Sequence, residues 1–320
     1  MMPSPANTTA VPAATIRADG LSRRFGKHAA VDGIELELRR GEVLGFLGPN
    51  GAGKTTTMQM LTGNLAPTTG SVSICGVDLL ESPVEAKAHI GYLPEVPPLY
   101  RDLTVKEYLD LVVRLHRVPK AGRAAAVKRA CERCGLGDVS RKLIGTLSKG
   151  YQQRVGIAQA IVHEPDVIIL DEPTVGLDPN QIRDIRALIR ELGGAHSVIL
   201  STHILPEVEA ICDRVQIMHH GKMIYADTIA ELKQLHNGRT LLVGLNQPPA
   251  VEELMAIAGV VHADLVGENL FRVRVAPESD PTERIVSMAA QKLWGLRQIG
   301  PAQTSLEDVF VNLTRRDKND

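Results

Sequence analysis

The stretch Gly-Pro-Asn-Gly-Ala-Gly-Lys-Thr-Thr, residues 48–56, decides the fold class of this 320-residue chain. It lies between an apolar run and an amphipathic stretch, so we expect a strand, a tight turn and a helix over residues 53–65. Gly48, Gly51 and Gly53 lack a Cβ atom, so the backbone can take positive φ angles and bring its N–H groups close to a phosphate. The helix directs its positive end at the same anion. The sequence therefore predicts a nucleoside triphosphate site.

The last three residues of this loop have separate expected contacts. Lys54 reaches the β- and γ-phosphates, and the hydroxyl of Thr55 is a ligand for Mg²⁺. Thr56 donates to the α-phosphate. A glycine-rich turn alone is usually only a turn. Here the spacing, the Lys-Thr pair and the position between strand and helix agree on a phosphate-binding loop.

Composition excludes several classes of protein. The net charge is −1, from 36 basic and 37 acidic residues, so nothing indicates a nucleic-acid partner. Four cysteines do not make a disulfide framework in a chain of this length. No run reaches the ~18 apolar residues of a membrane span. Residues 1–14 are rich in Pro, Ala and Thr and are predicted to be a disordered tail. We expect a cytoplasmic location.

The rest of the chain predicts an α/β core over residues 15–236 with a mostly helical insert at about 96–160. The apolar runs Val167–Leu170 and Val198–Leu200 are typical of strands buried on both faces of a parallel sheet. Capping boxes are predicted at Ser82 and Thr104.

Residues 237–320 predict a second, smaller domain. The pattern strand, helix, two strands, helix, strand is the order of an α+β ferredoxin-like domain. A last helix is predicted to be capped by Thr304 and Glu307.

Two carboxylates follow the apolar run 167–170. Ligands bind at the carboxyl ends of strands in open α/β sheets. Asp171 would hold Mg²⁺ through water, and Glu172 would polarise the attacking water as general base.

The segment Leu-Ser-Lys-Gly-Tyr, residues 147–151, begins another helix. Taken alone, Ser148 is more often an ordinary N-cap than a ligand. Phe25, on a polar turn, taken alone is equally well a half-buried core residue.

These motifs, in this order, resemble the ATP-binding cassette (ABC) family over residues 15–235. The resemblance implies a P-loop NTPase fold with a RecA-like core, an antiparallel β subdomain and a helical insert. It implies that Phe25 stacks on adenine, that residues 147–151 are the signature, and that Gly176-Leu177-Asp178 is a dimer-contact loop. His203 is similar to the switch histidine, and Glu95 stands where the lid loop usually has glutamine.

The resemblance also implies the site as a whole. The expected catalytic residues are Glu172, His203 and Lys54, and the expected Mg²⁺ site contains Thr55, Glu95 and Asp171. The residues expected to bind ATP are Phe25, Gly48, Pro49, Asn50, Gly51, Ala52, Gly53, Lys54, Thr55, Thr56, Ser148 and Gly150.

One phosphate loop and one signature in a chain imply a homodimer or a paired ATPase subunit. Without a spanning helix, transport falls to a separate integral membrane permease, docked beside Glu95, with this chain peripheral on the cytoplasmic face of the inner membrane. The lid loop, the signature and the segment 305–310 together resemble the gliding-motility and multidrug/polysaccharide exporter branch. The alternatives are a soluble ABC-type ATPase acting on nucleic acid or the ribosome, and a binding module without catalysis.

Overall fold

The computed structural model describes residues 14–234, 240–276 and 279–301 of the chain. The chain divides into two compact units, Met1–Asp227 and Thr228–Asp320. The predicted tail and the helix expected at Thr304 lie outside the described residues, apart from residue 14. The domain boundary expected at residue 236 remains a prediction.

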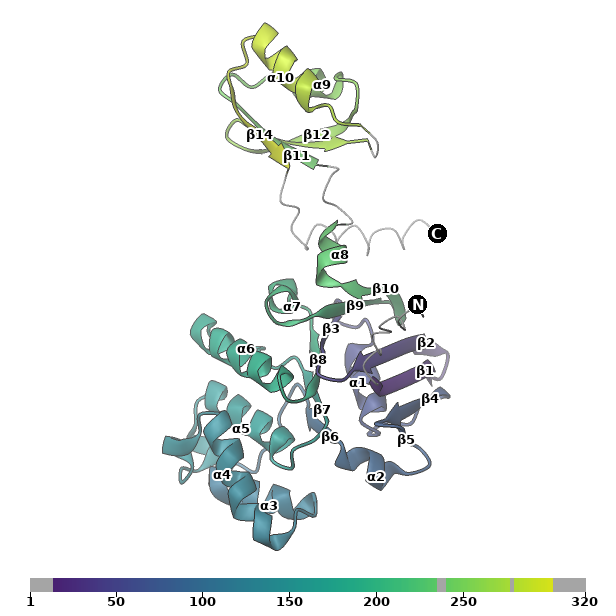
Figure 1. Cartoon of the computed structure of the whole chain (residues 1–320), viewed down its shortest axis with the longest axis vertical. Helices are drawn as coiled ribbons and strands as arrows, with labels where there is room; N and C mark the ends of the chain where they lie inside the picture. Colours follow the sequence, from purple (N-terminus) through teal and green to yellow (C-terminus); the bar gives the residue numbers. More distant parts are fainter. Residues whose placement is uncertain (1–13, 235–239, 277–278, 302–320) are drawn as a thin grey trace, which may run out of the picture. The chain divides into compact units, whose positions relative to one another are not determined.

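The first unit is built on a six-stranded sheet with the order β10-β9-β3-β8-β7-β6 (Figure 1). Strands β3, β7 and β8 are buried along their whole length and pair in parallel, as the continuous apolar runs predict. Because all parallel strands end at one edge, the residues that follow them gather there. The strands are β3 (Val43–Leu47), β6 (Ile90–Leu93), β7 (Val167–Asp171), β8 (Ser197–Thr202), β9 (Arg214–His219) and β10 (Lys222–Thr228).

A second, antiparallel sheet has the order β2-β1-β4-β5. One core joins its inner face to helix α1 (Lys54–Leu61) and to the parallel sheet, through residues such as Ile16, Met58 and Ile169. The helix that begins at the phosphate loop is therefore fixed between two sheets. The strands are β1 (Ala14–Phe25), β2 (His28–Arg39), β4 (Thr69–Ile74) and β5 (Val77–Asp78).

Helix α1 is shorter than the predicted span of 53–65. The Thr62 hydroxyl donates to the Met58 carbonyl, and Gly63 has a φ of 66°, a left-handed conformation that ends the helix. Glycine at this position stops the helix before the apolar pattern stops.

The remaining helices of this unit include those of the predicted insert. Thr104 forms the predicted capping box with Glu107. The box predicted at Ser82 is wrong, because Ser82 has a ψ of 60°, outside the extended region that aims an N-cap side chain at the helix. The helices are α2 (Pro83–Ala88), α3 (Val105–Leu115), α4 (Arg123–Arg133), α5 (Lys149–Ile161), α6 (Pro179–Gly193) and α7 (Leu205–Ile211).

The second unit contains an antiparallel sheet with the order β12-β13-β11-β14 and a core around Phe271, Ile285 and Trp294. The predicted succession of strand, helix, two strands, helix and strand is present. The elements are α8 (Ile229–Gln234), β11 (Thr240–Leu245), α9 (Val251–Met255), β12 (Val260–Gly267), β13 (Leu270–Val275), α10 (Thr282–Gln291) and β14 (Leu296–Pro301).

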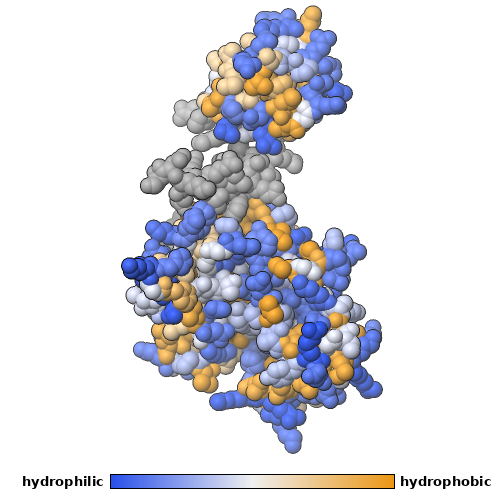
Figure 2. All heavy atoms as spheres, turned by 180° about the vertical axis from the view of Figure 1, so that it is seen from behind, coloured by the Kyte–Doolittle hydropathy of each residue, from blue (hydrophilic) through white to orange (hydrophobic). Residues whose placement is uncertain are grey.

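Hydrophobic residues on the face drawn in Figure 2 form scattered patches among hydrophilic ones. Within the described residues, no helix has both the length and the apolar character needed to cross a bilayer.

Candidate active site

The phosphate loop connects buried strand β3 to helix α1. Gly51 and Gly53 have φ angles of 79° and 108°, so both glycines occupy the predicted positive-φ region. The same expectation for Gly48 is wrong. Gly48 is not in that region, and a Cβ atom there would collide with the backbone carbonyl of Met218 on β9. Glycine is needed at position 48 for close approach of two strands, and at 51 and 53 for the turn itself.

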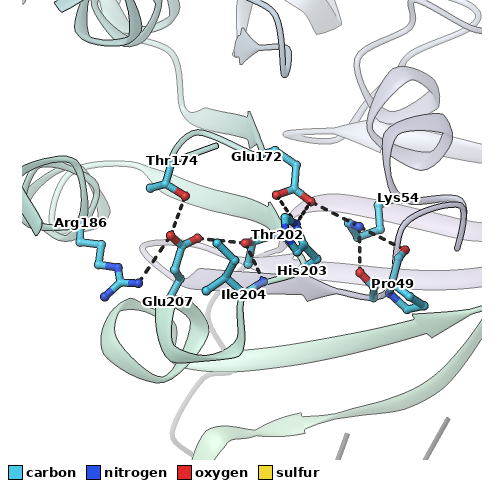
Figure 3. Close-up of polar contacts among 10 residues, drawn as sticks. Pro49, Lys54, Glu172, Thr174, Arg186, Thr202, His203, Ile204 and Glu207 are labelled. Atoms are coloured by element: carbon cyan, nitrogen blue, oxygen red, sulfur yellow. Dashed lines mark hydrogen bonds and ion pairs between the residues drawn. The ribbon is translucent and has the colours of Figure 1, made fainter. Parts of the chain in front are cut away.

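Lys54, the first residue of α1, is 6% exposed and turns back over the loop. Its Nζ donates to the carbonyl oxygens of Gly48 and Pro49 at 2.8 and 3.4 Å. The same atom lies 3.4 Å from Oε1 of Glu172 (Figure 3). The loop therefore holds a buried ammonium group at the end of the sheet, where it faces a carboxylate.

Glu172 follows strand β7 and has a φ of 49°, which is unusual for a residue with a side chain. Its backbone N–H donates to the Ser201 carbonyl of the neighbouring strand β8 at 2.9 Å. Its carboxylate lies 2.9 Å from Nδ1 of His203, which comes directly after β8. Backbone strain of this kind costs about 1–2 kcal/mol and is often retained at functional sites.

Asp171, the last residue of β7, is fully buried. Within the described part of the chain, neither of its carboxylate oxygens makes a hydrogen bond of good geometry, although the Ser201 and Thr55 hydroxyls lie close to them. Burial raises the pKa of this carboxyl, the hydroxyls of Ser201 and Thr55 oppose that shift, and the charges of Glu172 and Glu95 add to it. A buried carboxylate beside a hydroxyl is a donor set suited to a hard divalent cation.

Three predicted site residues lie on other parts of the first unit. Phe25 is half exposed at the turn between β1 and β2, with the guanidinium carbon of Arg23 at 4.8 Å from its ring centroid. Ser148 is exposed and caps α5, and Gly150 is buried against the side chain of Gln181. In residues 14–234, no hydrogen bond or ion pair joins these three to Lys54.

The comparisons with known proteins show the family of the chain. Residues 31–175 match the family model described as ABC transporter. The chain is 34% identical over 300 residues to the bacitracin transport ATP-binding protein BcrA of Bacillus licheniformis, covering 93% of this chain and 96% of the relative. The chain belongs to the family of ABC transporter ATP-binding proteins. It is an ABC transporter ATPase, the ATP-hydrolysing partner of a membrane permease.

Other relatives of this ABC ATPase have the same extent. The Nod factor export ATP-binding protein I of Burkholderia lata is 34% identical over 314 residues, 97% of this chain and all of that protein. Among solved structures, the ATP-binding subunit of an ABC transporter is 30% identical with a TM-score of 0.63, over 69% of this chain and 92% of that one. cbiO1 from Clostridium perfringens, described as part of the ABC transporter complex cbiONQ, is 29% identical with a TM-score of 0.63, over 68% and 90% of the two chains. The P-loop NTPase fold with its antiparallel subdomain is thus confirmed.

One buried group of this ABC ATPase is absent from the sequence-based predictions. Glu207 on α7 is fully buried and contacts Thr174, Thr202 and Arg186 beside the Glu172–His203 pair (Figure 3). In the sequence, Glu207 stands in the segment Leu-Pro-Glu-Val-Glu, residues 205–209, beside a second glutamate that is exposed. The signal in the sequence is that Glu207 stands four residues before the apolar Ile211, a spacing that puts both on one face of a helix.

Proposed function

We propose that this ABC ATPase hydrolyses ATP with Glu172 as the general base, Lys54 as the phosphate-binding cation and His203 as the γ-phosphate contact. The observation that carries the proposal is that the Glu172 carboxylate contacts both Lys54 and His203. Glu172 and His203 directly follow the parallel strands β7 and β8. Glu172 takes a proton from the attacking water while the oxygen of that water bonds to the γ-phosphorus. The bond to the bridging oxygen breaks, and ADP and phosphate form.

The loop residues bind the phosphates mainly through their backbone. Successive N–H groups at the start of α1 point to one anion, and the helix dipole adds to the attraction. Phe25, exposed at a turn of the antiparallel sheet, provides a face for the adenine ring. The loop residues that contribute are Gly48, Pro49, Asn50, Gly51, Ala52, Gly53, Thr55 and Thr56.

We also propose a Mg²⁺ site. The two buried oxygens of Asp171, with the Thr55 hydroxyl beside them, fit a divalent cation bound chiefly through water. Glu95 is exposed after β6, and its charge acts on Asp171, so it completes an acidic group around the same point. When bound, Mg²⁺ neutralises charge on the β- and γ-phosphate oxygens.

A second copy of the chain completes the site. Ser148 is exposed at the N-terminus of α5 and makes no hydrogen bond to Lys54 among the described residues. Two chains that face each other place Ser148 and Gly150 of one chain on the γ-phosphate bound by Lys54 of the other. ATP then connects donors from both chains, because its terminal oxygens carry the charge that satisfies them.

We propose export as the direction of transport. This rests on the names of the relatives, which include bacitracin transport, Nod factor export and daunorubicin resistance ATP-binding proteins. Glu95 and the Leu-Ser-Lys-Gly-Tyr signature support the gliding-motility and multidrug/polysaccharide exporter branch. The chain acts at the cytoplasmic face of the inner membrane, peripheral to its permease. A net charge of −1 supports a partner other than nucleic acid.

The C-terminal region, residues 237–320, is proposed to be a ferredoxin-like accessory domain. Its strand order β12-β13-β11-β14, with antiparallel neighbours and a helix after the first and third strands, supports this.

Two variants test the proposed chemistry. Glu172→Gln should retain ATP binding and lose hydrolysis by roughly 10²–10⁴-fold, since the amide cannot accept the proton. Lys54→Ala should lose ATP binding itself. Glu81→Gln, which changes an exposed carboxylate, is the matched control. A Glu172→Gln protein that turns over at the wild-type rate would refute the assignment of the base.

A further inference from the structure

Glu207 is a carboxylate enclosed by protein beside the proposed site. It lies in the first turn of α7, and its side chain is 1% exposed. Oε1 accepts from the Thr174 hydroxyl at 2.5 Å and lies 3.5 Å from a guanidinium nitrogen of Arg186. Oε2 accepts from the Thr202 hydroxyl at 2.9 Å. A buried carboxylate is costly unless it is paired and hydrogen-bonded, so these contacts hold the surrounding segments to it.

Each contact comes from a different segment of the active site. Thr174 lies in the turn after β7 that carries Glu172, and Thr202 is the residue before His203. Arg186 comes from α6, the helix that follows the expected dimer-contact loop. The segments are distant in sequence but meet at one carboxylate (Figure 3).

The hydrogen bond between Glu207 and Thr202 is linked to His203, the expected switch histidine, through the backbone of the turn. The same Thr202 hydroxyl accepts from the N–H of Ile204 at 3.0 Å, so it spans the turn that contains His203. The imidazole in turn contacts Glu172 at 2.9 Å. A path of contacts thus runs from Glu207 through the turn to the proposed general base.

We propose that Glu207 is a positioning residue that couples the turn carrying the base to the turn carrying the switch histidine, and both to α6. It does not touch the nucleotide. It sets the geometry in which His203 and Glu172 meet the γ-phosphate and the attacking water. The inference rests on the proposed function, because Glu207 can be a positioning residue only if Glu172 and His203 take part in hydrolysis.

The test compares hydrolysis and binding in Glu207→Gln. The amide keeps the volume but loses the charge that faces Arg186 and one of the two acceptor oxygens. We expect kcat to fall roughly 10–100-fold, as small misplacements of catalytic groups do. ATP affinity, measured by equilibrium binding of a fluorescent ATP analogue, and KM should stay within about twofold. Glu85→Gln, an exposed carboxylate in the first turn of α2, is the matched control and should keep wild-type kcat.

A double-mutant cycle separates positioning from general destabilisation. Because Glu207 acts through the turn at 202–203, its effect on kcat should largely disappear in a His203→Gln background. Thr202→Val tests the same path and serves if Glu207→Gln does not fold. Its kcat should fall with ATP affinity retained.

Three results would overturn the inference. They are a wild-type kcat in Glu207→Gln, an equal loss of ATP affinity and kcat, and an effect of Glu207→Gln on kcat that is as large in the His203→Gln background as in the wild type. Failure of the proposed function is distinct, because Glu172→Gln would then hydrolyse ATP normally. If Glu172→Gln is inactive and Glu207→Gln is normal, only the role of Glu207 is lost.

Discussion

Replacing Gly53 with alanine should destabilise the first unit more than the same change at Gly51. Both glycines have positive φ angles, 108° and 79°, which cost an L-residue about 1–2 kcal/mol. At Gly53 the new Cβ would also lie 2.5 Å from the carbonyl oxygen of Ala30 and 2.6 Å from Cε of Met218. At Gly51 nothing lies within 4 Å. The overlap with a backbone atom, which cannot rotate away, adds roughly 1–3 kcal/mol.

The assay is thermal unfolding of the full chain. The transition followed is the one that ATP with Mg²⁺ shifts to higher temperature in the wild-type protein. With about 2–4 °C per kcal/mol for a unit of this size, Gly53→Ala should melt roughly 2–12 °C below Gly51→Ala. The stabilisation by ATP should be lost in Gly53→Ala, since the phosphate loop must move to relieve the contact. Equal melting temperatures for the two variants would refute the steric reasoning.

Three further outcomes follow from the structure. Phe25→Ala should change the free energy of unfolding by less than about 0.5 kcal/mol, because the ring is half exposed. In equilibrium titrations it should weaken ATP binding by about 1–3 kcal/mol, and unchanged affinity would exclude adenine stacking. Asp171→Asn should raise the free energy of unfolding without Mg²⁺ by about 1–2 kcal/mol, because it removes a buried charge that burial disfavours, while hydrolysis is lost; a less stable variant would contradict this. Burial lowers the pKa of His163 from its ordinary 6.5 to about 4. The folded chain therefore keeps this imidazole neutral, and its contribution to stability is complete above pH 6.5 and falls as pH drops toward 4, by about 3 kcal/mol at most. Urea titrations of wild type and His163→Asn across this range should converge at low pH, and parallel curves would rule the effect out.

The phosphate loop could be predicted from the sequence because its chemistry uses consecutive residues. Strand β7 and the two carboxylates at its end could be predicted because an apolar run is followed directly by two acids, and ligands bind at the carboxyl ends of strands in open α/β sheets. Roles for His203 and Ser148 could be predicted only from the ABC resemblance, because a single histidine or serine indicates no particular function.

Other features depend on neighbours that no local pattern names. Gly48 is required by the carbonyl of Met218, which a distant strand brings beside it. The surroundings of Glu207 become visible only when Thr174, Thr202 and Arg186 are brought around it in the folded chain. Ser82 has the right type and spacing for a capping box, yet its backbone conformation prevents it.

The most direct test of the shared ATP site is the mass of the Glu172→Gln chain in solution, measured by light scattering with and without ATP and Mg²⁺. We predict a nucleotide-dependent doubling of mass, abolished by Ser148→Arg, which places a bulky side chain at the helix start proposed to contact the other chain's ATP. Ser71→Arg makes the same change at an exposed serine on β4, so it is the matched control and should leave the doubling intact. A mass that ATP does not change, or a doubling that Ser148→Arg leaves intact, would contradict the shared site.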